Sequence, residues 1–392
     1  MRTMHRLLAA AVTTLGLTAS PGAWAQTQGV TDAEIVLGTH LDLSGPIASW
    51  GLPIKNGMEM AVEDANAKGG IHGRKIRLIV EDSGYDPKKA VLATNKMLAH
   101  DKIFAMVGAL GSVTAGAAMP LVLKQGLPHL FPITPADVFF DPFHKFKFAM
   151  FSPYYDDIRT GVKHQVQTRG KKRVGIMYQD DEFGANVLKG VKDQLAALNL
   201  TLASTTSYKR GATDFSSQIA KLKSDGVDLV VLGTIIRETV GAMTAARQAG
   251  WDVDFLGTQA VYVPEVPMLG KQMVEGLYGS GQTPIPEAAT ADSELAAWLK
   301  RYEQKFGKPA NVQAVVGYIV LDTTFRGMES AGRDLTPDSL VAGIERIVNY
   351  KNMFGTAPLT FSKDNHLGTR EVFMAQIRNG KWVRLTDFGT YR

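Results

Sequence analysis

The chain has 392 residues, of which 45% are hydrophobic, and it carries 43 Lys and Arg against 38 Asp and Glu. At about 100–200 residues per domain, this length predicts two or three domains, and the composition excludes collagen, a coiled coil and a disordered tail. The absence of cysteine excludes disulfide scaffolds, Cys-ligated zinc, iron–sulfur clusters and thiol nucleophiles. A net charge of +5 without a clustered basic patch gives no indication of nucleic-acid binding.

The first residues have the three parts of a secretory signal. Arg2 and Arg6 form a positive region, residues 7–17 an apolar segment too short to span a bilayer, and residues 23–25 (AWA) a cleavage motif. We expect residues 1–25 to be removed as a signal peptide, which leaves a mature chain with a net charge of +3. Because no later stretch reaches 18 consecutive apolar residues and a lipid-acceptor cysteine is absent, we expect a protein exported to the periplasm and not embedded in a membrane.

After Gln26, short β-branched or apolar runs alternate with amphipathic segments. Apolar residues three to four apart predict the helices, and glycine, proline and acidic residues mark their ends. The first array is predicted as strand 34–38, helix 54–68, strand 75–81, helix 87–100, strand 103–107, helix 114–124 and strand 129–133. The second is predicted as strand 173–178, helix 184–198, strand 202–208, helix 215–223, strand 227–233, helix 238–248 and strand 254–257.

Two consecutive strand–helix arrays predict an α/β protein of two doubly wound lobes with parallel sheets. The remaining third is predicted as helices 291–306, 312–330 and 337–348 and short strands 360–361, 371–377 and 382–385. We expect these segments to return to the two lobes, so that residues 27–153 and 282–354 form the N-terminal lobe and residues 154–281 and 355–392 the C-terminal lobe. A chain that crosses between lobes more than once forms a hinge, which predicts a cleft that opens and closes.

Motifs of enzymes are absent from the sequence. It contains no G-x-G-x-x-G after the first strand, no phosphate-binding loop, no H-E-x-x-H and no G-x-S-x-G nucleophile elbow. None of the eight histidines lies two or four residues from another, so neither a metal site nor a cofactor is predicted. The acidic doublets at 156–157 and 180–181 are typical of helix starts, where they favour the helix dipole. We therefore expect a binding protein and not an enzyme.

An ordered set of motifs connects the chain to a known family. These are GTHLDLSGPIASWG at 38–51, ANAKGGIHGRKI at 65–76, DPKKAV at 86–91, DDEFG at 180–184, TDF at 213–215 and the segment 355–366. Together they resemble the leucine/isoleucine/valine-binding family of periplasmic binding proteins, the solute receptors of ABC importers of the branched-chain amino-acid type. The resemblance implies a type I periplasmic-binding fold, with two lobes joined by three crossovers that close over a small ligand. It also implies a monomer that delivers its ligand to an ABC permease with cytoplasmic ATPases.

The ligand is expected beyond the carboxyl ends of the first lobe's strands, where open parallel sheets bind ligands. The loops there are rich in hydroxyls and lead into a helix N-terminus, which favours a carboxylate. The family pattern places the ligand carboxylate at Ser112 and Thr134, with Ile133 adjacent through its backbone, and packs Trp50 on the ligand. Without the resemblance, Ser112 is interpreted as a helix cap and Trp50 as a core residue.

The second lobe departs from the family pattern. Phe183 matches an aromatic residue that covers the ligand, but Gln259 stands where leucine-binding members place a glutamate for the ligand ammonium. Ile235 also replaces an aromatic residue of the family. Because an unpaired ammonium in a closed cleft costs a few kcal/mol, we predict a carboxylate ligand with an aromatic body, of the benzoate, hydroxybenzoate or cinnamate type.

Other interpretations of the cleft stay open. Asp42, Asp156 or Glu238 could supply the missing negative charge. An aromatic-rich stretch before the first expected crossover is predicted to be mostly core, and its last members, Tyr154 and Tyr155, are cleft candidates, with Tyr155 included in the predicted site. A branched-chain amino acid or its keto acid is the alternative ligand. A ligand sensor for a signalling receptor is the alternative role.

Overall fold

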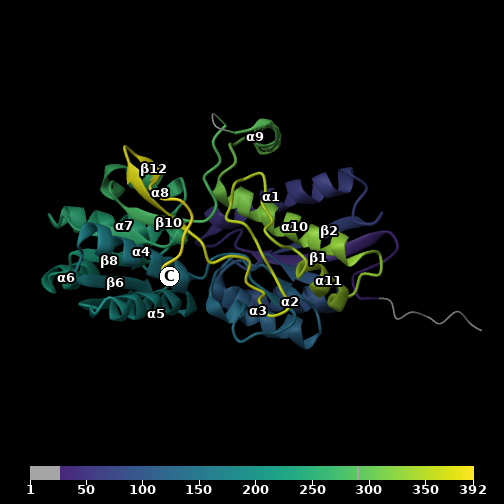
Figure 1. Ribbon diagram of the computed structural model, residues 1–392, viewed down its shortest axis with the longest axis horizontal. Helices are drawn as coiled ribbons and strands as arrows, with labels where there is room; N and C mark the ends of the chain where they lie inside the picture. The colour runs from purple at the N-terminus through teal and green to yellow at the C-terminus, as the bar shows by residue number, and fades with distance from the viewer. Residues whose placement is uncertain (1–26, 289–290) are drawn as a thin grey trace, which may run out of the picture.

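The computed structural model describes residues 27–288 and 291–392, and the predicted signal peptide at residues 1–25 lies outside this part. Figure 1 shows two lobes that lie side by side, each with helices packed around its own sheet. In the described part, strands and helices alternate largely as the sequence predicts, but the helices Tyr154–Arg169 and Glu265–Gly270 and the strands Lys147–Phe148 and Tyr278–Gly281 are not predicted, and the predicted strand 360–361 is not formed. The prediction of an α/β protein with two doubly wound lobes is confirmed.

The first lobe is built on a parallel sheet with the strand order β2-β1-β3-β4-β5. Its strands are β1 (Glu34–Leu41), β2 (Lys75–Asp82), β3 (Ala105–Val107), β4 (His129–Leu130) and β5 (Lys147–Phe148). One face is covered by α1 (Ala48–Ala67), α9 (Ser293–Phe306), α10 (Val312–Ala331) and α11 (Pro337–Ile344), and the other by α2 (Pro87–Ala99), α3 (Ser112–Lys124) and η1 (Asp137–Phe139). β2 and β3 flank β1 on opposite sides, so the loops after β1 and β3 lie at the topological switch point, where such sheets bind ligands.

The second lobe has the strand order β12-β11-β10-β9-β8-β6-β7. Its strands are β6 (Val174–Gln179), β7 (Ser204–Tyr208), β8 (Leu229–Gly233), β9 (Asp254–Gly257), β10 (Tyr278–Gly281), β11 (Phe373–Arg378) and β12 (Lys381–Arg384). One face is covered by α4 (Tyr154–Arg169) and α5 (Glu182–Ala197), and the other by α6 (Ser216–Ser224), α7 (Ile236–Gln248) and α8 (Glu265–Gly270), with η2 (Gln259–Val261) and η3 (Lys271–Val274) beside them.

This second sheet is parallel only as far as β10. β11 pairs antiparallel with both β10 and β12, so the expectation of a purely parallel sheet is wrong at this edge. The antiparallel β11–β12 pair follows from a tight hairpin turn, in which Asn379 and Gly380 both take positive φ angles, of 53° and 73°. Asn-Gly is the dipeptide that this kind of turn favours.

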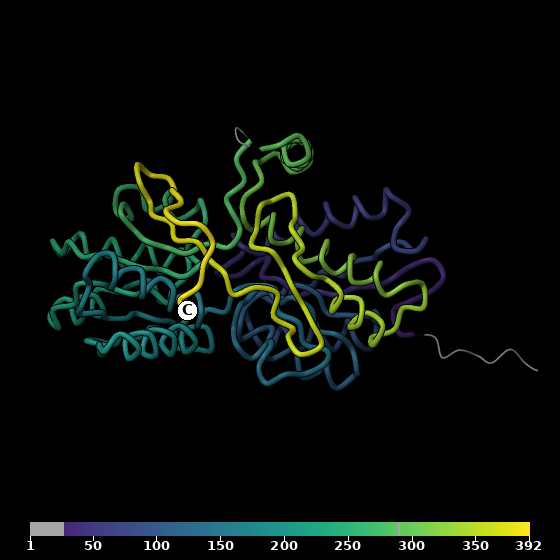
Figure 2. Tube along the Cα trace, in the orientation of Figure 1, coloured from purple at the N-terminus to yellow at the C-terminus, as the bar shows by residue number. Residues whose placement is uncertain are grey.

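Three crossovers connect the lobes and are hydrogen-bonded to one another. The backbone N–H of Ser152 donates to the Gln282 side-chain oxygen at 2.7 Å, and the Ser152 hydroxyl donates to the backbone oxygen of Arg370 at 3.0 Å. Figure 2 shows the last crossover as the yellow segment, which runs along the first lobe before it reaches the second. Residues of all three crossovers therefore meet around Ser152.

The last return to the second lobe occurs later than the boundary expected at 354/355. Phe361 packs in the first lobe against Phe131 and Phe148, with ring centroids 5.5 and 5.9 Å away, and Leu367 forms a β-bridge with Ala149. The segment 355–367 therefore belongs to the first lobe, because it buries apolar side chains in that lobe's core.

Four helices, α1, α3, α5 and α7, begin two to six residues earlier than the periodicity predicts, and the early starts of α1 and α3 place two predicted site residues. α1 begins at Ala48 instead of residue 54, although Pro53 lies inside it. Pro53 is the sixth residue of the helix, where it removes a hydrogen bond to the backbone oxygen of Ser49, and because such a proline usually marks a helix boundary, the early turns are hard to recognise in the sequence. α3 begins at Ser112 instead of residue 114. Trp50 and Ser112 consequently lie on the first turns of helices and not in loops.

Candidate functional site

A cavity lies between the lobes at the carboxyl ends of β1 and β3. Measured as the space open to the centre of a water molecule, its volume is about 80 Å³. One water needs about 10–15 Å³ on this measure, so the space is that of a small molecule. The first lobe contributes Ile47, Trp50, Tyr85, Leu110, Gly111, Ser112, Ile133, Thr134, Pro135, Val312 and Val316. The crossovers contribute Phe151, Gln282 and Thr283, and the second lobe Tyr154, Phe183, Ile235, Gln259, Ala260, Tyr262 and Gly281.

One end of the cavity is formed by hydroxyl groups. The Ser112 and Thr134 hydroxyl oxygens lie 2.5 Å apart in a hydrogen bond, and both side chains are buried. Ser112 is the first residue of α3, so the positive end of the helix dipole lies beside this pair. Gly111 precedes it with φ of +92°, and a Cβ there would come within 2.5 Å of the Tyr85 ring. Glycine at 111 therefore allows the tyrosine to pack against the start of the helix.

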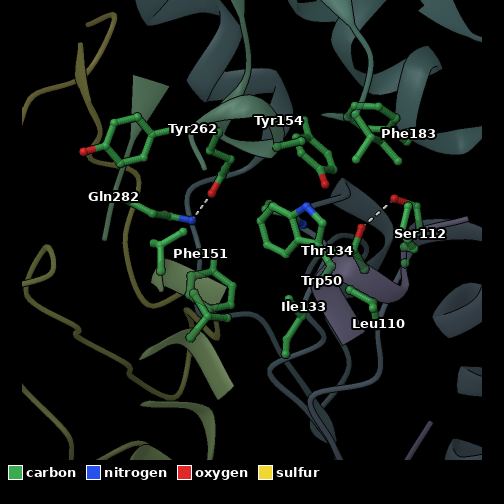
Figure 3. A pocket seen from close by; sticks show the side chains of 18 of the residues that line it. Trp50, Leu110, Ser112, Ile133, Thr134, Phe151, Tyr154, Phe183, Tyr262 and Gln282 are labelled. Carbon is green, nitrogen blue, oxygen red and sulfur yellow. Dashed lines mark hydrogen bonds between the residues drawn. The ribbon is translucent and has the colours of Figure 1, made fainter. Parts of the chain in front are cut away.

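Trp50 stands in the middle of the cavity, between this hydroxyl end and Gln282 (Figure 3). Its position depends on Asp42, whose two carboxylate oxygens accept the backbone N–H groups of Gly45 at 2.5 Å and Ile47 at 2.8 Å. These bonds form the turn from which α1 begins. The indole N–H of Trp50 is buried and has no hydrogen-bond partner among the described residues.

Aromatic side chains of the second lobe close the cavity. Asp181 caps α5 by accepting the N–H groups of Phe183 and Gly184, which places Phe183 on the first turn. The Phe183 and Tyr154 rings pack edge to face, with centroids 4.6 Å apart (Figure 3). Burial raises the pKa of both Tyr154 and Tyr85 well above the usual value, so their hydroxyls stay neutral at physiological pH.

The Gln259 amide is directed to the hinge. Its Nε2 donates to the Ser152 carbonyl at 2.8 Å, and its Oε1 accepts from the Gln282 amide. The backbone N–H of Gln259 donates to buried Asp157 at 2.9 Å, and Asp157 also accepts from the Ser280 hydroxyl. Burial raises the pKa of Asp157 to about 7. Gln259 therefore links the second lobe to two crossovers.

The three acidic residues that could have supplied a charge are engaged elsewhere. Asp42 holds the turn before α1, Asp156 forms an ion pair with Arg370, and Glu238 forms one with Arg237 at 3.0 Å. None of the three lines the cavity. Among the described residues that line the cavity, none is Asp, Glu, Lys, Arg or His. The lining is thus neutral, with aromatic walls and a hydroxyl pair at one end.

Residues 34–381 match the model of the periplasmic binding protein family. The chain belongs to this family. A relative, the Leu/Ile/Val-binding protein of Citrobacter freundii, is 28% identical over 235 residues, which cover 60% of this chain and 64% of that protein. The aligned region thus spans slightly less than two thirds of such curated relatives. Family members of this kind are binding proteins, so the expectation of a protein that is not an enzyme is confirmed.

Solved structures show the same fold. A fatty acid ABC transporter substrate-binding protein from Thermomonospora curvata has a TM-score of 0.83 at 25% identity and covers 93% of this chain and 94% of its own. A solute-binding protein of an ABC transporter from R. palustris, in complex with benzoate, has a TM-score of 0.80 at 20% identity over 92% of this chain and 96% of its own. The fold is therefore that of type I periplasmic binding proteins. In the described part, no helix of this family member combines the length and hydropathy needed to cross a bilayer.

The structure brings most of the predicted site residues together. Seven of them line the cavity, namely Trp50, Ser112, Ile133, Thr134, Phe183, Ile235 and Gln259. Tyr155 does not. Its hydroxyl donates to Asp193 at 2.8 Å, and the Lys189 ammonium lies 4.0 Å from its ring centroid. Successive residues of a helix point about 100° apart, so Tyr154 faces the cavity and Tyr155 faces α5.

The lining residues that the sequence prediction did not include in the site comprise, among others, Tyr85, Tyr262, Gln282 and Thr283. Tyr85 follows the carboxyl end of β2, a position at which parallel sheets place ligand contacts, and this signal was available in the sequence. Gln282 follows β10 at a crossover. Its position depends on where the chain changes lobes, for which the local sequence holds no distinct signal.

Proposed function

We propose that this periplasmic binding protein is the solute receptor of an ABC importer and that it binds a small carboxylate with an aromatic body in the cavity between the lobes. The observation that carries the proposal is the charge pattern of the lining. Hydroxyls beside a helix N-terminus occupy one end, aromatic rings surround the middle, and none of the described lining residues is acidic. We also propose that residues 1–25 direct its export.

The hydroxyl end is suited to an ionised carboxylate. The mutual hydrogen bond uses one of the two hydroxyl protons, so the Ser112–Thr134 pair can donate its other proton to a ligand, and the first backbone N–H groups of α3 have no partner within the helix. A hydrogen bond to a charged group contributes about 1.5–3 kcal/mol, roughly twice a neutral one. This end can therefore bind a carboxylate without a positively charged side chain.

The same pattern disfavours an α-amino acid. An amino acid brings an ammonium next to its carboxylate, and none of the described lining residues is acidic. The Gln259 amide, which stands at the family's glutamate position, is already bonded to Ser152 and Gln282. Leaving a buried charged group unpaired costs more than 1–3 kcal/mol, or at least one to two decades of affinity. A branched-chain keto acid lacks the ammonium and is the second candidate, whereas the relatives are named for binding leucine, isoleucine and valine themselves.

Capture would proceed by closure of the lobes. In the described conformation the lobes are in contact: Arg210 of the second lobe donates to the backbone oxygen of Tyr85 at 3.0 Å. Elsewhere along the interface, the backbone N–H of Asp137 donates to the Asn186 side chain at 2.9 Å. A ligand shifts the open–closed equilibrium only by its differential affinity for the closed state. Because Tyr85 both lines the cavity and takes part in this contact, ligand packing and closure are coupled there.

The proposal is tested by thermal unfolding of the mature protein after refolding to remove carried ligand. The panel contains benzoate, 4-hydroxybenzoate, cinnamate, octanoate, leucine, valine and 4-methyl-2-oxopentanoate. At about 100 times its dissociation constant, a true ligand stabilises by about 2.7 kcal/mol. We expect the aromatic acids to give the largest shift and leucine to give none. Preferential stabilisation by leucine would contradict the aromatic-acid proposal.

A matched pair of variants tests the position of the carboxylate. Ser112→Ala removes one hydrogen bond to the ligand and is expected to weaken every carboxylate in the panel by about tenfold. Ser217→Ala removes a hydroxyl from the exposed first turn of α6 and should leave all affinities unchanged. Equal affinities of the two variants, measured by calorimetry, would show that the carboxylate binds elsewhere.

A further inference from the structure

A second, smaller cavity lies behind the wall opposite the hydroxyl end. Its volume, on the same measure, is about 10 Å³, close to the space of one water molecule. It shares Phe151, Gln282 and Thr283 with the main cavity, so these three residues form a partition between the two spaces. The far side of the partition is lined by aliphatic side chains and by the two threonines Thr356 and Thr369.

The partition carries one hydroxyl that has no partner. Thr283 is 3% exposed, and its Oγ1 forms no hydrogen bond with any described residue. Both ends of the neighbouring Gln282 amide are occupied, one by the Ser152 N–H and the other by Gln259. A buried hydroxyl without a partner is unfavourable compared with a methyl group of the same size. Of the polar side-chain groups on this partition, the Thr283 hydroxyl is therefore the one that is left for a ligand.

The partition lies across the cavity from the hydroxyl end. This arrangement determines which part of a bound ligand contacts the partition. Figure 3 shows Ser112 and Thr134 on one side of Trp50 and Gln282 on the other. An aromatic acid is rigid and planar, so the bond from its carboxylate to the ring also fixes the direction of the ring position opposite. With the carboxylate at Ser112 and the ring lying along the cavity beside Trp50, that position would point toward the partition.

We propose that Thr283, with the small cavity behind it, is a distal subsite that selects aromatic acids bearing a hydroxyl opposite the carboxylate. The inference rests on the proposed function, because it assumes that the carboxylate binds at Ser112. A phenolic hydroxyl can donate to Thr283 Oγ1 or accept from it, since each group is both a donor and an acceptor. The small cavity adds room for one oxygen-sized group, not for a longer chain.

The test compares the affinities of benzoate, 3-hydroxybenzoate and 4-hydroxybenzoate for the mature protein and three variants, by calorimetry. We expect the unsubstituted protein to bind 4-hydroxybenzoate about tenfold more tightly than benzoate, and 3-hydroxybenzoate without that gain. Thr283→Val should remove the preference, so that benzoate and 4-hydroxybenzoate bind with equal affinity, whereas Thr283→Ser should retain the preference. Thr323→Val is the matched control, because Thr323 is also a buried, unpartnered threonine but does not line either cavity.

The outcomes separate the two proposals. Binding of benzoate that depends on Ser112, without any preference for 4-hydroxybenzoate, would overturn the distal subsite and leave the proposed function standing. Retention of the preference in Thr283→Val, or its loss in Thr323→Val, would also overturn the subsite. If no carboxylate in the panel binds, both proposals fail together. If Thr283→Val does not fold, Thr283→Ser against the unsubstituted protein still decides, since its loss of the preference would overturn the subsite.

Discussion

The two lobes meet at one cavity but present it with opposite chemistry. The first lobe supplies the buried hydroxyls of Ser112 and Thr134 at the start of a helix, and these are bonded to each other. The second lobe supplies aromatic cover from Tyr154 and Phe183, while its most polar lining group, the Gln259 amide, is bonded to the crossovers. The difference shows a division of roles, in which the first lobe is suited to hold the charged end of a ligand and the second to enclose its apolar body.

The lobes also differ in the titratable groups they bury behind the cavity walls. The first lobe buries His40 and His129, and burial lowers their pKa values to about 4 and about 3. The second buries Asp157, and burial raises its pKa to about 7. Both kinds of group are therefore mainly neutral around pH 6. Burial thus favours the neutral form of these three groups, but with opposite dependence on pH in the two lobes.

The largest expected effect is on the stability of the first lobe in acid, and its absence would contradict the difference between the two lobes. In the unfolded chain both histidines take up protons below about pH 6.5, but in the folded protein only below about 4 and 3. Their contribution to stability is therefore complete above pH 7 and is lost as the pH falls toward 4. At about 1.4 kcal/mol per unit of pKa difference, the histidine contribution falls by several kcal/mol between pH 7 and 4.5, while Asp157, with its pKa raised to about 7, changes stability in the opposite direction. The histidine contribution is therefore measured by urea unfolding as the difference in pH dependence between a histidine variant and the unsubstituted protein.

A variant pair assigns that loss to its source. His129→Leu removes a buried titratable ring and should make the free energy of unfolding less dependent on pH. Phe104→Leu changes a buried residue of the same lobe that does not titrate and should leave the dependence unchanged. An equal pH dependence in His129→Leu and the unsubstituted protein would mean that the buried histidines are not the cause.

An intermediate effect concerns the aromatic cover of the second lobe. Phe183→Ala removes a ring that is 2% exposed and contacts Tyr154, and a fully buried aromatic ring contributes about 1.5–3 kcal/mol. We expect the affinity for an aromatic acid to fall by about 10- to 150-fold, measured by calorimetry. Phe255→Ala, in the core of the same lobe but outside the cavity, should lower stability and leave affinity nearly unchanged. A similar loss of affinity in both variants would show that the loss comes from destabilising the second lobe and not from a contact between Phe183 and the ligand.

The smallest expected effect concerns the hydroxyl pair of the first lobe. Because Ser112 and Thr134 are hydrogen-bonded to each other, Ser112→Ala and Thr134→Val should not be additive, with a coupling of about 1 kcal/mol in binding free energy. Ser112→Ala and Thr283→Val alter opposite ends of the cavity and should be additive within about 0.5 kcal/mol. Additivity of the first pair would show that the two hydroxyls act on the ligand independently.

The sequence predicted the fold well because the strand–helix alternation is strong and glycine and proline mark its boundaries. It also predicted the residues that follow β1 and β3, since the carboxyl ends of neighbouring parallel strands must meet. The wrong predictions concern the residues at which helices begin and those at which the chain passes from one lobe to the other. Tyr154 and Tyr155 are neighbours on the first turn of α4, and only Tyr154 faces the cavity. The local sequence pattern does not indicate which of the two does so. The place where residues 355–367 pack was likewise decided by the burial of Phe361 and not by local pattern.

The neutral lining of the cavity has a consequence for how fast and under which conditions ligand can be captured. Without a formal charge on any described lining residue, the cavity has no fixed ion to draw an anion inward from a distance, so the encounter is governed by diffusion and by lobe opening. The fixed dipoles of α3 act only over the first turn. Dissolved salt screens long-range attraction and leaves short hydrogen bonds nearly intact, so a receptor of this design works almost equally well in dilute and in concentrated surroundings.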